Sequence, residues 1–184
     1  MFFGHWIMGI LFYVVTSVAI WIEGDRALIA HTLFTDANPE KTSTAGDIGK
    51  RFLTLLAPQD LPNQKRILVL LGLAIFFFAS TTQSNVHGYL RFMKKLTQGD
   101  YTLPDHPLFD YTVTPHYLAE CFEYLGLALI TAPVGEVFGK TMLCCFVFVA
   151  VNLGVTAQGT REWYRKSFGE EAVRGKARMV PLIW

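Results

Sequence analysis

The stretch Thr112-Val-Thr-Pro-His-Tyr-Leu-Ala-Glu120 decides how this chain folds, and Cys121-Phe-Glu-Tyr124 continues it. Thr114 suits the capping position before a helix. Pro115 suits the first helical position, where its missing N–H costs nothing. The stretch therefore predicts a helix that begins at Pro115 and continues into an apolar segment over about residues 117–131.

The predicted helix has one face with ionisable side chains and one that is mainly apolar. With 3.6 residues per turn, His116, Glu120 and Glu123 share one face, and mainly apolar residues occupy the other. Ionisable groups are costly at membrane depth, so they usually face a cavity or the interior of a helix bundle. This polar face is therefore a candidate lining of a functional site.

The composition indicates an integral membrane protein. Of the 184 residues, 52% are hydrophobic, 14% aromatic and only 17% charged. The net charge of +1 does not indicate a partner. A nucleic-acid-binding protein would be expected to carry a basic patch, and none stands out in the sequence.

Four apolar segments, at about residues 2–22, 67–79, 117–131 and 141–157, predict an all-α bundle with about four transmembrane helices. The second segment continues through polar residues to Leu90, and lipid cannot satisfy those hydrogen-bonding groups. A long polar connection with an interfacial helix around residues 48–56 follows the first segment. We therefore divide the chain into residues 1–66 and a C-terminal domain of residues 67–184.

The distribution of positive charge predicts the orientation. With four spans, the loop after the second span and the C-terminal tail lie on the same side. They carry Arg91, Lys94, Lys95 and six cations of the tail, nine of the 16 in the chain, so the positive-inside rule places the C-terminus in the cytosol.

Polar and charged residues gather at the cytosolic ends of the last three predicted spans. Cations near helix ends suit a phosphorylated ligand, and carboxylates suit a ribose hydroxyl or an amide, so the group is compatible with a dinucleotide. Its members are Asn85, His87, Lys94, His116, Glu120, Arg161, Tyr164, Arg165, Lys176 and Arg178. Helix capping, packing and interfacial charge are the alternative explanation for these residues.

Several familiar motifs do not occur. The sequence has neither GxGxxG nor a Walker A loop, so a nucleotide site here is not of the Rossmann or P-loop type. His116 and Glu120 are four residues apart, but without HExxH or HxxHH boxes we predict no metal. A GxSxG elbow for a serine hydrolase is also missing.

The order of the polar pieces resembles the C-terminal domain of the steroid 5α-reductase family, and within it the polyprenol (polyprenal) reductase branch. The pieces are Asn85-Val-His87 with Lys94, Phe109 to Glu120, Thr160-Arg-Glu-Trp-Tyr-Arg-Lys-Ser-Phe168, and Lys176-Ala-Arg-Met-Val-Pro181. The resemblance covers about residue 67 to the C-terminus.

The resemblance implies a multi-pass enzyme of the endoplasmic reticulum membrane that transfers hydride from NADPH to a carbon–carbon double bond conjugated to a carbonyl. In this branch the substrate is a long-chain polyprenoid, whose α-isoprene unit is reduced toward dolichol for protein N-glycosylation. By position, the ten residues named above would hold NADPH. Family members carry the substrate-engaging tyrosine and glutamate in earlier spans, so we assign no catalytic residue and expect this chain to be a C-terminal part.

Other functions remain open at this stage. Two enzymes of the same fold are a steroid 5α-reductase and a trans-2-enoyl-CoA reductase. An isoprenylcysteine-type methyltransferase shares a similar C-terminal layout but uses a methyl donor. The non-enzymatic alternative is a membrane scaffold or an inactive, truncated paralogue.

Overall fold

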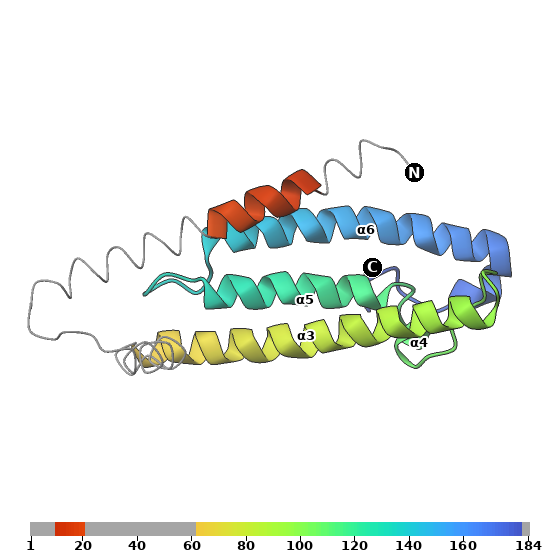
Figure 1. The fold of residues 1–184 in the computed structure, drawn as a ribbon, viewed down its shortest axis with the longest axis horizontal. Coiled ribbons are helices and arrows are strands. Elements are labelled where there is room, and N and C mark those ends of the chain that lie inside the picture. The colour runs from red at the N-terminus through yellow and green to blue at the C-terminus, as the bar shows by residue number, and fades with distance from the viewer. Residues whose placement is uncertain (1–9, 21–61, 182–184) are drawn as a thin grey trace, which may run out of the picture. The chain divides into compact units, whose positions relative to one another are not determined.

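The computed structural model describes residues 10–20 and 62–181, which are mainly helical (Figure 1). The chain divides into two compact units, Met1–Leu61 and Pro62–Trp184. The first contains the helix Ile10–Ile20, which covers part of the first predicted span. The interfacial helix expected around residues 48–56 lies outside the described residues.

The second unit holds the elements that concern function. They are α3 (Asn63–Leu96), the short α4 (Leu108–Tyr111), α5 (Pro115–Ile130), α6 (Lys140–Phe168) and the 3₁₀ helix η1 (Glu170–Val173). Within the described residues there are no strands, and one isolated parallel bridge joins Thr112 to Ala177. α5 runs antiparallel to α3 and α6, so the C-terminal ends of α3 and α6 lie at the same end as the start of α5 (Figure 1).

α3 is one continuous helix of 34 residues. It contains both the apolar segment at residues 67–79 and the polar residues that follow it to Leu90. The hydroxyls of Thr81 and Thr82 donate to the carbonyls of Phe77 and Phe78 one turn earlier, which satisfies these hydroxyls within the helix. The buried residues of α3 are Gly72, Ala79 and Val86, spaced seven apart. This spacing keeps small or compact side chains on the single face that packs against α5.

α3 and α5 approach most closely where two glycines meet. A Cβ added to Gly126 would lie 2.8 Å from the Gly72 carbonyl oxygen, and one added to Gly72 would lie 2.7 Å from the Gly126 carbonyl oxygen. Small residues at helix crossings allow this backbone contact in membrane proteins. The two glycines therefore fix the spacing of the helix pair.

The far end of α5 is held by backbone and ammonium contacts. The Gly139 N–H donates to the Ala128 carbonyl oxygen at 2.7 Å, which folds the α5–α6 connection back onto α5. The Lys65 ammonium, from the first turn of α3, donates to the carbonyls of Ile130 and Ala132. A cation is favourable there because the last carbonyls of a helix have no partner within it.

α6 extends beyond the predicted fourth span. The sequence placed the end of that span at about residue 157, but the helix continues without a break to Phe168. Its last turn carries Arg165 and Lys166, as the last turn of α3 carries Lys94 and Lys95. Cations at these C-terminal ends interact favourably with the helix dipoles.

Two helices of the described chain, α3 and α6, are long and apolar enough to cross a membrane. Their outward faces expose large apolar side chains, such as Phe78 at 76% and Val155 at 67%, which suits contact with lipid. Within residues 10–20 and 62–181, four spans are not shown. α5 has 16 residues, because Pro133 and the glycines after it end the apolar run early.

Candidate functional site

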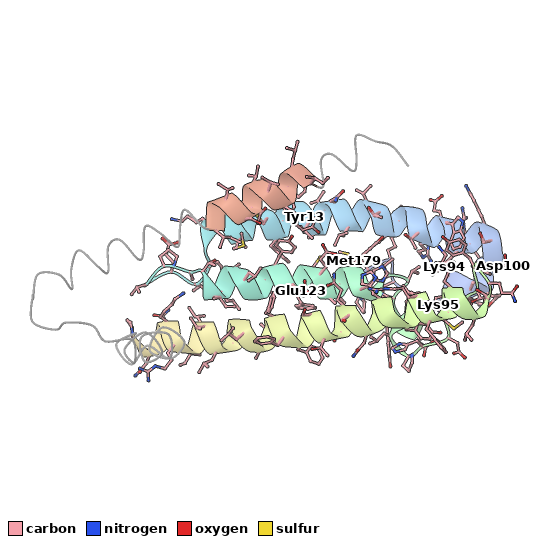
Figure 2. All side chains as sticks on the ribbon, viewed as in Figure 1. Tyr13, Lys94, Lys95, Asp100, Glu123 and Met179 are labelled. Carbon is pink, nitrogen blue, oxygen red and sulfur yellow. The ribbon has the colours of Figure 1, made fainter. Side chains whose placement is uncertain are left out.

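A cavity of about 620 Å³ lies where α3 and α6 end and α5 begins. α3, the loop at residues 100–104, the first turn of α5 and the last turns of α6 form its wall. The lining residues are His87, Leu90, Arg91, Met93, Lys94, Asp100, Tyr101, Thr102, Pro104, Tyr117, Thr160, Trp163 and Tyr164. Figure 2 shows Lys94, Lys95 and Asp100 together at this end of the unit.

The rim of the cavity combines cations with aromatic rings. The Lys94 ammonium lies 5.7 Å from the centre of the Tyr101 ring, and that ring meets Trp163 edge to face at 5.2 Å. His87, Arg91 and Lys94 are spaced four and three residues apart, so they share one face of α3. The rim therefore presents two positive charges beside two exposed aromatic rings.

Tyr89 anchors the loop that carries Tyr101. The Asp105 N–H donates to the Tyr89 hydroxyl at 2.8 Å, and the Tyr89 ring contacts His106 and Phe109 at centroid distances of 5.2 and 6.3 Å. Phe109 is 3% exposed and belongs to the core beneath the loop. These contacts hold the loop against α3.

The inner wall joins all three long helices. The His87 ring packs edge to face on His116 of α5 at 5.0 Å, and His116 packs on Tyr117 at 4.4 Å. Tyr117 and Thr160 of α6 share a side-chain hydrogen bond. The buried Nδ1 atom of His116 has no hydrogen-bond partner in the structure, which is unusual for a buried polar atom.

The polar face predicted for α5 packs against α3. Gln83 donates its Nε2 hydrogen to Glu120 Oε2 at 3.2 Å, and Ser80 bonds to Glu123 one turn further along. With the His87–His116 contact, these pairs form a polar seam between the two helices. Only Tyr117 of α5 reaches the cavity lining.

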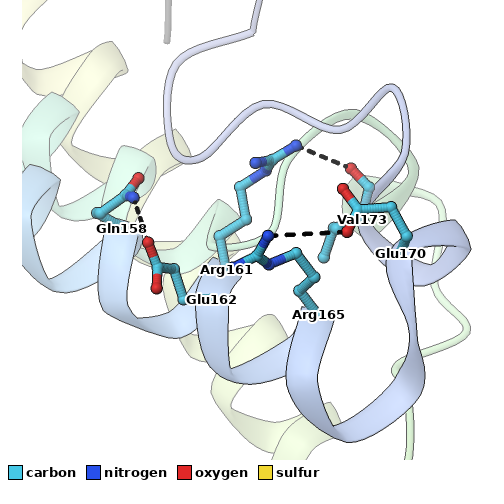
Figure 3. A network of polar contacts seen from close by, with 6 residues as sticks. All are labelled: Gln158, Arg161, Glu162, Arg165, Glu170 and Val173. Atoms are coloured by element: carbon cyan, nitrogen blue, oxygen red, sulfur yellow. Dashed lines mark hydrogen bonds and ion pairs between the residues drawn. The ribbon is translucent and has the colours of Figure 1, made fainter.

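A second polar network joins the end of α6 to the chain that follows it (Figure 3). Arg161 donates from Nη2 to the Val173 carbonyl oxygen at 3.4 Å, and Arg165 lies 4.0 Å from the Glu170 carboxylate. Both side chains therefore contact the returning tail, and neither lines the cavity. The Nε atom of Arg161 is buried without a partner.

The structure brings together some of the ten predicted site residues and separates others. His87, Lys94 and Tyr164 line the cavity, and His116 touches His87. Glu120 lies in the polar seam and Asn85 on the exposed surface of α3. The remaining four, which are absent from the lining, belong to the end of α6 or the tail: Arg161, Arg165, Lys176 and Arg178.

Several lining residues were outside the predicted set. Arg91 could have been included, because it lies one turn from His87 and three residues before Lys94. Tyr101 and Thr102 had no comparable signal, since a loop has no periodicity to indicate which side chains point inward. Within the residues that the structure describes, His, Cys, Asp and Glu side chains do not gather into groups of three that could hold a metal ion.

The sequence matches a family model described as 3-oxo-5-alpha-steroid 4-dehydrogenase over residues 41–184. The chain therefore belongs to the steroid 5α-reductase family, which confirms the family to which the motifs pointed.

Relatives of two kinds are similar to the chain. A steroid 5-alpha-reductase of Solanum lycopersicum is 31% identical over 61% of this chain and 42% of its own length. Polyprenal reductase 1 of Oryza sativa subsp. indica is 32% identical over 61% of this chain and 31% of its own length. Polyprenal reductase of Xenopus laevis is 26% identical over 71% of this chain and 41% of its own length.

The chain therefore matches less than half the length of these relatives. No solved structure matches the chain.

Proposed function

We propose that this chain is the NADPH-binding C-terminal part of a membrane reductase that reduces the α-isoprene double bond of polyprenal or polyprenol toward dolichol. The observation that carries the proposal is the cavity. It lies in the matched region of a reductase family and combines two cations, aromatic rings and hydrogen-bonding groups on one surface.

The cavity suits a dinucleotide in size and chemistry. Its volume of about 620 Å³ is within the usual range for cofactor sites. Arg91 and Lys94 supply the positive charge that phosphate groups need, while Tyr101 and Trp163 offer ring faces for a flat base. His87 and Thr160 on the inner wall provide hydrogen-bonding groups for an amide or a ribose.

NADPH, when bound, supplies the hydride for reduction of the double bond. The part played by this chain would be to bind and orient the cofactor at the mouth of the bundle. The apolar outer faces of α3 and α6 would meet lipid, in which a polyprenoid dissolves. The distribution of cations supports a cytosolic tail. Membership of the family supports a location in the endoplasmic reticulum membrane.

Reduction of a steroid is the second candidate. It is favoured by the tomato relative, whose identity of 31% over 115 residues is close to the 32% over 114 residues of the rice polyprenal reductase. Microsomes that express the chain in a full-length context should be assayed in parallel with polyprenal and with a 3-oxo-4-ene steroid. Reduction of the polyprenal alone supports the first proposal, and reduction of the steroid alone replaces it.

The cofactor is tested most directly by titration of the purified chain in detergent with NADPH and with NADH. We expect micromolar binding that favours NADPH. Lys94→Met should weaken it, whereas Lys95→Met is a matched control, since Lys95 is exposed on the same turn but does not line the cavity. Equal losses from both variants, or no NADPH binding by the unmodified chain, would contradict the proposed site.

A further inference from the structure

The tail returns from the end of α6 to the start of α5. We call residues 170–181 the C-terminal strap; it begins after Gly169, whose φ of 90° turns the chain out of α6. The Ala177 N–H donates to the Tyr111 carbonyl oxygen at 3.0 Å, and the Val113 N–H donates to the Ala177 carbonyl oxygen at 3.0 Å. These bonds fasten the strap to the segment before α5.

Two buried threonine hydroxyls add to this attachment. Thr114 is fully buried, and its hydroxyl donates to the Arg178 carbonyl oxygen at 2.8 Å. Thr112 is 3% exposed, and its hydroxyl lies 3.0 Å from the Met179 carbonyl oxygen. Thr112 also accepts from the Thr114 N–H at 3.4 Å, so the two threonines support each other.

The hydroxyl of Thr114 has a different partner from the one its position suggests. Thr114 is the residue before α5, as the sequence predicted, but its side chain makes no capping hydrogen bond to the helix. The hydroxyl is directed to the strap instead. A capping residue ordinarily stabilises its own helix, so this arrangement uses that side chain to join two segments 64 residues apart.

The other end of the strap is attached to α6 beside the cavity. Arg161, which donates to the Val173 carbonyl oxygen, follows Thr160 and precedes Tyr164 by three residues. Val173 is itself 1% exposed. Thr160 and Tyr164 line the cavity from α6, and Tyr117, three residues after Thr114, lines it from α5. The strap therefore connects two walls of the cavity.

We propose that Thr112 and Thr114 are positioning residues. Their hydroxyls hold the strap and so set the placement of α5 relative to α6 at the cofactor cavity. We call the hydrogen bonds from these two hydroxyls to the strap the clasp. The contacts of the clasp are made to backbone carbonyls of the strap. Binding of the cofactor between α5 and α6 and ordering of the strap then favour each other. This inference rests on the proposed function only for the identity of the ligand, NADPH.

Amide hydrogen exchange followed by mass spectrometry tests the clasp without the cofactor. The whole purified chain in detergent is compared with Thr112→Val/Thr114→Val, which removes both hydroxyls and keeps the side-chain volume. We expect peptides that contain Ala177 to exchange about tenfold faster or more, because buried carbonyls lose their donors. Thr112→Ser/Thr114→Ser, which restores the hydroxyls, should exchange like the unmodified chain.

A matched control replaces threonines whose hydroxyls bond only within their own helices. Thr82→Val/Thr156→Val removes the bonds to Phe78 and Asn152 and should leave exchange of the strap unchanged. Circular dichroism checks that each variant keeps its helices. The single variant Thr114→Val repeats the test if the double variant does not fold.

The coupling to the cavity is measured by titration with NADPH. The valine pair should raise the dissociation constant by about tenfold, the serine pair should not, and NADPH should slow strap exchange in the unmodified chain. Exchange of the valine pair at the unmodified rate would overturn the clasp. Faster exchange with an unchanged dissociation constant would overturn the coupling. Failure of the unmodified chain to bind NADPH would overturn the proposed function and the coupling, and the clasp would then be decided by exchange alone.

Discussion

The contact between α3 and α5 leads to a specific prediction for Gly126→Ala. The new Cβ would lie 2.8 Å from the Gly72 carbonyl oxygen and 3.0 Å from the Phe76 backbone nitrogen. Both atoms belong to the backbone of a packed helix, so α3 and α5 must move apart. Overpacking of this kind costs about 1–3 kcal/mol, while replacing a helical glycine by alanine returns roughly 1 kcal/mol. We therefore expect a net loss of up to about 2 kcal/mol in the free energy of unfolding.

Gly88→Ala provides the matched control on α3, because a Cβ at Gly88 would meet no atom within 4 Å. It should leave stability unchanged or raise it by up to about 1 kcal/mol. Unfolding by sodium dodecyl sulfate, followed by circular dichroism in detergent, compares the two variants under the same conditions. Gly126→Ala should also weaken NADPH binding, since the helix spacing positions His87 against His116. Equal stability of the two variants would refute the argument that backbone contact sets the spacing.

Three further predictions follow from individual side chains. Lys94→Met should raise the dissociation constant for NADPH about tenfold and reduce its dependence on salt, while Lys95→Met should do neither, as titration at two ionic strengths will show. Glu120→Ala in a full-length context should sharply lower NADPH-dependent reduction in microsomes without preventing membrane insertion, and near-normal turnover would contradict a role for the polar seam. Lys65→Met should lower the free energy of unfolding by about 1–3 kcal/mol, because two carbonyls at the end of α5 lose a charged donor. The control variant Lys140→Met, which breaks an exposed ion pair, should change the free energy of unfolding by less than about 1 kcal/mol.

The C-terminal helices were largely predictable from local patterns. The Thr-Pro dipeptide at residues 114–115 marks where α5 begins, and the apolar runs predicted the cores of α3 and α6. The number of spans was less predictable, because length and composition do not show where a helix stops. α5 ends after 16 residues, whereas α6 continues through polar residues that a hydropathy pattern would exclude.

The partners of the polar residues could not be predicted. Periodicity correctly placed His116, Glu120 and Glu123 on one face of α5, but it did not show whether that face meets a cavity or another helix. In the structure, Glu120 and Glu123 bond to α3 and only Tyr117 of α5 lines the cavity. Asn85 was predicted with His87, yet the two point differently because residues two apart on a helix differ by about 200°.

The sequence by itself determined the family, the helical character of the C-terminal part and the gathering of cations at one end of the bundle, since these follow from composition, periodicity and short motifs. Only the tertiary structure decided which side chains form the cavity and which hold the molecule together. Tyr101 lines the cavity because its loop is anchored to Tyr89. The hydroxyl of Thr114 bonds to the strap because the chain folds back and brings the Arg178 carbonyl, 64 residues later, next to it. Such contacts depend on how helices and loops pack in space, which local sequence patterns do not encode.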